Sequence, residues 1–240
     1  MANVKNILVG AADIYISGIG EDGPTAAAAI DVPSNKSYSD ATDGIAKSGS
    51  KFRNMGFTTE GLELSYEPDY GDVVVDQLLD SARIFKQGLK VMLKTSFSEG
   101  TLENLQVAFG QDDSTLVGGT AVNALVVNSA ASNTTLSIAA GGLGTSPVER
   151  SIVAIGQAPN TLGTTKAASG FGGGTYDSTA KKKERVYVAR RVVSMETVAH
   201  GLKRTDATVF PVTFRCLPDT TNGAADASEY GKIIDRVYGA

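Results

Sequence analysis

Two alternating stretches, Leu62-Glu63-Leu64-Ser65-Tyr66-Glu67 and Leu89-Lys90-Val91-Met92-Leu93-Lys94-Thr95-Ser96-Phe97, determine the fold class that the sequence predicts. In both, apolar side chains recur at every second residue, and mostly charged or small polar residues lie between them. Successive residues of an extended chain point to opposite faces, so this period of two indicates β-strands with one face in water. We expect Glu63 and Glu67 on the polar face of the first strand, and Lys90 and Lys94 on the polar face of the second.

Further short runs of apolar and β-branched residues predict more strands along the chain. These runs span residues 7–18, 72–77, 122–127, 135–139, 151–156, 185–198 and 207–217. The segment Pro68-Asp69-Tyr70-Gly71 is typical of a turn, and Pro211, which lacks an N–H, favours a sheet edge or a bulge. Residues 226–238 indicate a weak terminal helix or arm. The expected fold is mainly β, an antiparallel β sandwich or barrel-like domain with a flanking helix and long loops.

The flanking helix is predicted just after the second alternating stretch. Three apolar residues are spaced so that they share one helical face, which we expect to pack on the sheet: Leu102, Leu105 and Phe109. Thr101 or Ser98 can cap the start of the helix, and Gly110 follows where a left-handed C-terminal residue is favoured.

The organisation is that of a single domain over residues 1–240, with two unusual segments. Residues 19–56 are rich in Gly, Ser, Asp, Asn and Ala and predict a long loop, which in a compact domain is usually functional or disordered. Residues 116–183 form a possible inserted or variable region, and its first part, 116–148, carries no charge. Two interpretations of 116–148 stay open: a surface that another protein covers, or an ordinary hairpin with small side chains.

Composition excludes several classes of chemistry. The chain has 240 residues, one Cys, one His and no Trp, so it can form neither an internal disulfide nor a Cys/His zinc site. It has no apolar run of the ~20 residues that a membrane helix needs, and its first residues do not resemble a signal peptide. We interpret His200 as a turn residue and Cys216 as a core residue. We expect no catalytic residue, metal or cofactor, and synthesis in a reducing cytoplasm.

Charge is unevenly distributed along the chain, although the net charge is only -4. Residues 1–115 hold 9 basic and 17 acidic side chains, whereas residues 150–215 hold 11 basic and 4 acidic ones. If these segments present different surfaces, copies could associate head-to-tail, which generates rings or open filaments.

Several segments, in order along most of the chain, resemble the tail tube proteins of long-tailed bacteriophages. The first is Gly56-Phe57-Thr58-Thr59-Glu60-Gly61 with the alternating stretch that follows it. A second is Glu99-Gly100-Thr101-Leu102-Glu103-Asn104-Leu105, which looks like that family's segment from strand to helix. The opening residues 6–15 and the late residues 208–219 are also similar. Residues 116–183 depart most from the pattern.

The resemblance implies a structural role in the virion. Tail tube proteins form rings, commonly hexameric, which stack into a hollow tube through which DNA passes without specific binding. Their partners are copies of themselves and other tail proteins, such as tape measure, terminator and distal tail proteins. Glu63 and Glu67 would then face a lumen in which like charge keeps DNA from adhering.

The resemblance also implies that the long loop reaches a neighbouring ring. The loop residues expected at that contact are Pro24, Pro33, Lys36, Lys47, Lys51 and Arg53. On this interpretation, deletion of residues 24–50 leaves a folded subunit that cannot polymerise. The alternatives are another β-rich virion protein, such as a capsid decoration or tail terminator protein, and, third, a β-sandwich hydrolase. No catalytic constellation in the sequence supports an enzyme.

Overall fold

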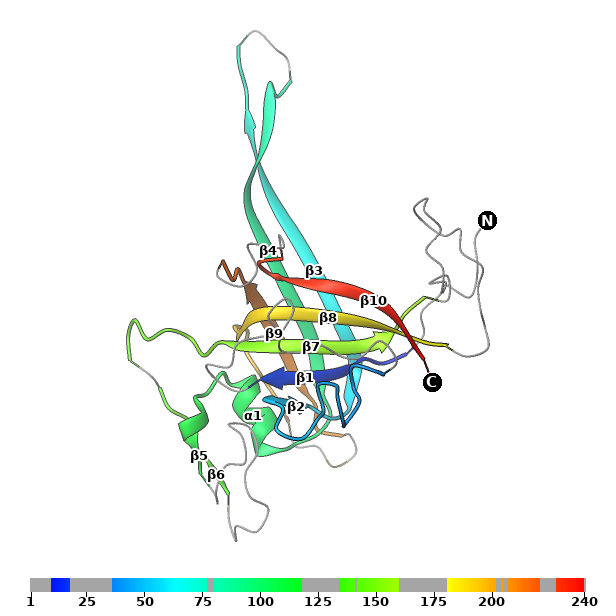
Figure 1. Cartoon of the computed structure of the whole chain (residues 1–240). Helices are drawn as coiled ribbons and strands as arrows, with labels where there is room; N and C mark the ends of the chain where they lie inside the picture. Colours follow the sequence, from blue (N-terminus) through cyan, green and yellow to red (C-terminus); the bar gives the residue numbers. More distant parts are fainter. Residues whose placement is uncertain are drawn as a thin grey trace.

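The chain folds into one open antiparallel sheet with a short helix against it (Figure 1). The computed structural model describes residues 10–17, 36–76, 80–117, 134–140, 142–159, 181–201, 204, 207–220 and 228–239. Within these residues, eight strands form the main sheet and two more form a small ribbon. The prediction of a mainly β chain with one flanking helix is therefore confirmed. Neither of the two sheets closes into a barrel.

The main sheet has a strand order that differs widely from the order along the chain. From one edge to the other the strands are β2 (Phe52–Asn54), β1 (Asp13–Ser17), β7 (Arg150–Gln157), β8 (Lys181–Ser194), β9 (Phe210–Leu217), β4 (Arg83–Phe97) and β3 (Thr58–Val73). The eighth strand, β10 (Gly231–Gly239), pairs with β8. The separate ribbon joins β5 (Leu116–Val117) to β6 (Thr135–Leu136), and a 3-10 turn at Asp113–Thr115 precedes it.

Strand β8 forks the sheet because it has two partners along one edge. Residues 181–189 pair with β10, and residues 191–194 pair with β9. Arg190 lies between these two ladders with only 2% of its surface exposed, and its Nε donates to the carbonyl oxygen of Ser228 at 3.1 Å. Gly231 opens β10 at φ 141°, and a Cβ there would lie 1.9 Å from the carbonyl oxygen of Val188. Only glycine permits β10 to begin this close to β8.

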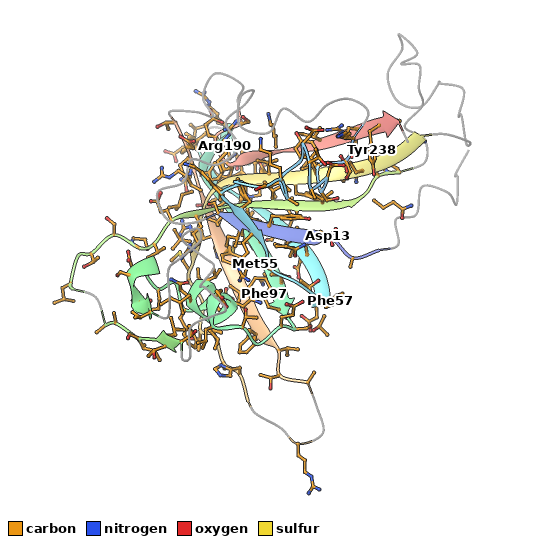
Figure 2. All side chains as sticks on the ribbon, turned by 60° about the horizontal axis from the view of Figure 1, so that its bottom comes forward. Asp13, Met55, Phe57, Phe97, Arg190 and Tyr238 are labelled. Atoms are coloured by element: carbon orange, nitrogen blue, oxygen red, sulfur yellow. The ribbon has the colours of Figure 1, made fainter. Side chains whose placement is uncertain are left out.

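The main hydrophobic core lies inside the bent sheet and draws on β1, β4, β7, β8, β9 and the helix. Met55 and Phe97, both labelled in Figure 2, are fully buried in it. Met55 follows β2, and its N–H donates to the carbonyl oxygen of Ile14 at 2.8 Å. Apolar side chains from strands far apart in sequence therefore meet at one centre, as burial of apolar surface requires.

The helix α1 (Leu102–Ala108) forms where the sequence predicts it, but another face is buried. Thr101 caps its start by accepting from the N–H of Asn104, and Gly110 beyond its end has φ 60°. Leu105 packs against the core, whereas Leu102 and Phe109 are only half-buried. The buried residues are Asn104, Gln106, Val107 and Ala108.

The buried face differs from the prediction because it includes an amide that hydrophobic spacing does not reveal. The Asn104 side chain donates to the carbonyl oxygens of Met55 at 3.1 Å and Glu99 at 2.9 Å, and accepts from Arg53. A buried polar group with several partners is tolerated in a core.

The predicted turn at Pro68–Gly71 is wrong, because β3 continues through it to Val73. Pro68 lies opposite Leu89 of β4, and β3 is the outermost strand of the sheet order. A proline is tolerated on an edge strand, where its missing N–H breaks no ladder. Residues 72–77 are consequently not a separate strand, and β4 begins at Arg83, six residues before its alternating stretch.

Other predicted elements are confirmed or corrected in detail. β7 and β9 form where strands are predicted, and β8 begins earlier and ends before Met195. The predicted terminal helix at 226–238 is wrong, because residues 231–239 pair with β8 as a strand. Pro211 is exposed and lies in the part of β9 that β8 does not pair, in agreement with an edge position. The predicted strand at 122–127 lies outside the described residues.

The second part of the predicted long loop folds back on its own sheet. Ile45 is 1% exposed and belongs to a second core cluster with Tyr15, Val153 and Val186. The Glu184 carboxylate accepts from the Ser37 hydroxyl at 2.6 Å and the Tyr38 N–H at 2.9 Å.

Arg236 of β10 also holds the loop segment 36–50 against the sheet. Arg236 contacts Glu184 at 3.3 Å, and its Nη2 donates to the carbonyl oxygen of Lys36 at 2.7 Å. Residues 36–50 therefore stabilise the subunit itself. The deletion of residues 24–50 would remove Ile45 from the core, so we expect the shortened subunit to be less stable than the natural chain; whether it folds stays a prediction.

We predict that Ile45→Ala lowers the free energy of unfolding by about 2–5 kcal/mol, because it leaves a cavity in the second cluster. Lys47→Ala, two residues away on the exposed side of the loop, is the matched control and should change it by less than about 0.5 kcal/mol. Urea unfolding followed by circular dichroism measures both. Equal effects of the two substitutions would contradict the packed loop.

Candidate functional site

The hairpin of β3 and β4 is the most prominent feature of the surface. Figure 1 shows that it extends well beyond the rest of the molecule and crosses the direction of β7, β8 and β10. The two strands pair from Leu62 opposite Thr95 to Val73 opposite Arg83, with one register shift between Asp69 and Tyr70. This continuous ladder holds its two faces in fixed positions.

One face of the hairpin is charged, and we call it the polar face. Glu63 lies opposite Lys94, and Glu67 lies opposite Lys90, with Lys90 Nζ 3.8 Å from Glu67 Oε2. All four side chains are exposed. The structure thus brings the four predicted residues together on one wet face. Arg215 of β9 lies beside Met92 on the same face, so the carboxylates of β3 lie next to cations on β4 and β9.

The other face of the hairpin is apolar. Near the body, Leu64 lies opposite Leu93 and Tyr66 opposite Val91. Beyond the register shift lies what we call the distal hairpin, residues 69–76 and 80–85, which exposes large apolar side chains on both of its faces. Tyr70 (58%) and Ile84 (63%) lie on the apolar face, whereas Val73 (42%) and Phe85 (43%) lie on the polar face, and Val74 (71%) follows β3. Several exposed large apolar side chains on one protruding element commonly mark an interaction site.

A groove of about 610 Å³ separates the base of the hairpin from β10, and we call it the β10 groove. Its floor includes Leu93, Ala189 and Cys216, and its walls include Leu89 and Ile233. The groove exists because β10 and β9 diverge at the fork in β8. Lys86 and Lys232 contribute its cationic groups and Glu229 an anionic one, and Lys86 Nζ lies 5.6 Å from the centre of the Tyr66 ring.

Cys216 is buried beneath this groove, as the sequence predicts for a core residue. Its side chain is 3% exposed. Burial raises the pKa of the Cys216 thiol from the ordinary value of 9.0 to about 11, because a thiolate loses hydration in the apolar interior. The thiol is therefore protonated at neutral pH and is a poor nucleophile.

The sheet has open edges that differ in length and charge. β2 has three residues, which offer little to a partner strand. β3 has sixteen residues, and its charged side chains are all carboxylates. β8 and β10 together carry eight basic and two acidic residues. Long open edges favour pairing with another chain. Four of the eight cations are engaged within the chain: Arg190 with Ser228, Arg185 with Asp235, Arg191 with Glu149 and Arg236 with Glu184. The charge contrast with β3 therefore rests on the lysines.

The residues expected at an inter-ring loop lie in several places. Pro24 and Pro33 lie outside the described residues. Lys36 forms an ion pair with Asp43 at 2.5 Å, while Lys47 and Lys51 are exposed.

Arg53 differs from the expectation, because it lies in β2, is half-buried and donates to the side chain of Asn104. Burial lowers the pKa of Arg53, whereas the neighbouring carboxylates of Glu103 and Glu99 raise it. Its interpretation as a loop residue is therefore wrong.

His200 is exposed, and its ring lies 4.9 Å from that of Phe210 and 6.2 Å from that of Phe109. In the described part of the chain, no three His, Cys, Asp or Glu residues gather as a metal site. No helix among the described residues is long and apolar enough to cross a membrane.

No protein-family model matches the chain, and no curated protein matches it.

We predict that the double substitution Glu63→Gln with Glu67→Gln changes the free energy of unfolding by less than about 1 kcal/mol, because exposed ion pairs contribute little. Glu184→Ala, which removes a carboxylate that is 3% exposed and leaves Arg236 without it, should lower it by about 3 kcal/mol or more. Chemical unfolding compares the two variants. A large loss in the double variant would show that the polar face serves stability.

We also predict that stability falls between pH 9 and pH 11 through Cys216. The unfolded thiol ionises near 9.0 and the folded thiol only near 11, so the folded state binds the proton more tightly over this range and loses stability as pH rises. Urea unfolding at pH 8 and pH 10.5 measures the fall. Cys216→Ala should show a smaller fall than the natural chain, and identical pH dependence in both would refute the assignment.

Proposed function

We propose that this chain is the structural subunit of a bacteriophage tail tube, and that its copies assemble into stacked rings around a channel for DNA. The observation that carries the proposal is the long hairpin, whose acidic edge strand β3 is open and sixteen residues long. A tail-tube fold requires sheets that continue from one subunit to the next. An open edge on β3 and a second one on β10 suit that requirement.

The charge distribution supports the same proposal. The carboxylates of β3 and the basic residues of β8 and β10 lie on different parts of one sheet. Surfaces of opposite charge on one subunit favour heterologous contacts between identical copies, and such contacts form rings when the rotation closes.

The polar face is our candidate for the channel surface. It carries Glu63, Glu67 and Asp69 with Lys90, Lys94 and Arg215, and its four central side chains are exposed. A surface of interspersed charge binds DNA weakly, because few phosphate counterions are released without a run of cations. DNA would therefore pass it without being held.

We predict that the purified protein forms tubes of stacked rings, visible by negative-stain electron microscopy. Isolated trimers or single rings would instead favour a capsid decoration or tail terminator protein. A monodisperse monomer at all concentrations would contradict a tube subunit.

The position of the polar face can be tested in the same tubes. Glu63→Cys adds a reactive thiol to a chain whose own cysteine is buried. A small maleimide and a maleimide on a large polyethylene glycol should both label the unassembled variant. In tubes, we expect the small reagent to react and the large one to be excluded, because it cannot enter a channel. Equal labelling of tubes by both reagents would place Glu63 on the outside.

A further inference from the structure

We propose that the distal hairpin of one copy of this chain occupies the β10 groove of a second copy. The inference rests on the proposed assembly role and makes a narrower claim, namely which two surfaces of the subunit meet. The hairpin and the groove occupy different places on the same chain, so the contact is heterologous and each copy can both give a hairpin and receive one.

The donor surface is exposed in the single chain. Tyr70 and Ile84 lie on the apolar face of the hairpin, at register positions near each other, and are 58% and 63% exposed. Val74, at the outer end of β3, is 71% exposed. Removing such side chains from water is favourable, so a partner that covers the distal hairpin would be bound.

The acceptor surface has a suitable size and chemistry. The groove holds about 610 Å³, within the roughly 300–1,000 Å³ that binding pockets commonly enclose, and apolar side chains dominate its lining. A copy cannot fill its own groove with its own distal hairpin. The β3–β4 ladder is continuous, and Figure 1 shows the distal hairpin beyond the body of the molecule.

Charge and strand edges favour the same pair of surfaces. The distal hairpin carries Asp69, Asp72, Asp76 and Asp80 against Arg83. The groove adjoins the basic strands β8 and β10, and Lys232 lines it. β10 uses one edge to pair with β8, and no described strand pairs its other edge. A hairpin entering the groove lies beside that edge, where backbone hydrogen bonds add to the apolar contact.

The test uses two variants, each of which places a charged side chain on one of the two apolar surfaces. Ile84→Glu places a charge on the donor hairpin, and Ile233→Glu places one on the groove wall. Both residues are largely exposed, at 63% and 56%, so each variant should fold, which thermal unfolding by circular dichroism checks. We expect each variant alone to stay monomeric at concentrations at which the natural chain assembles.

Mixing the two variants in equal amounts gives the decisive measurement. The Ile233→Glu copy keeps its hairpin and the Ile84→Glu copy keeps its groove, so they can make one contact and no more. Analytical ultracentrifugation should show a 1:1 heterodimer of twice the 24.8 kDa chain mass that does not grow further. Val74→Glu serves as a second donor variant if Ile84→Glu unfolds.

The control is Ile138→Glu, at an exposed residue (76%) after β6, which should assemble like the natural chain. A mixture that stays monomeric, or either surface variant assembling normally, would overturn the proposed contact. Tubes from the natural chain without a heterodimer from the mixture would leave the tail-tube proposal standing and remove this one. A heterodimer from the mixture without tubes from the natural chain would support the hairpin–groove contact and remove the tail-tube proposal.

Discussion

Strand β8 makes two different pairings along a single edge, and the rest of the structure depends on how the chain accommodates that change of partner. At Arg190 the ladder to β10 ends and the ladder to β9 begins. The buried guanidinium bonds to Ser228, and Gly231 lets the first residue of β10 approach the backbone of Val188. Because β9 and β10 diverge, the β3–β4 hairpin extends away from the other strands. An apolar groove lies between the base of the hairpin and β10. Arg190, which is buried, and Gly231 both lie at the point where the two ladders separate.

The sequence predicts the parts of this fold that local periodicity controls. The alternation in Leu62–Glu67 and Leu89–Phe97 predicts both strands and the exposure of Glu63, Glu67, Lys90 and Lys94, because a period of two assigns each side chain to a face. Thr101 and Gly110 likewise locate the ends of the helix. These signals are local and do not depend on which strands become neighbours.

The parts that the sequence does not predict depend on distant partners. Pro68 is tolerated within β3 because that strand lies at an edge, and its sequence position does not show this. Ile45 is buried and Arg53 faces Asn104 because a segment without periodicity packs on strands far along the chain. The sequence of residues 226–238 indicates a terminal helix or arm, and only the pairing with β8 makes residues 231–239 a strand. The groove arises from the fork, which no run of residues encodes by itself.

The strand order also has a consequence for how the chain folds. β1 ends at Ser17, yet one of its two neighbours, β7, begins at Arg150. Closing so long a loop is entropically unfavourable and slow. On a ribosome adding about 5–20 residues per second, the synthesis of β7 follows that of β1 by on the order of ten seconds. The β3–β4 hairpin, by contrast, pairs strands that are adjacent in the chain. We therefore expect the hairpin to form during synthesis and the β1–β7 ladder to complete the sheet late.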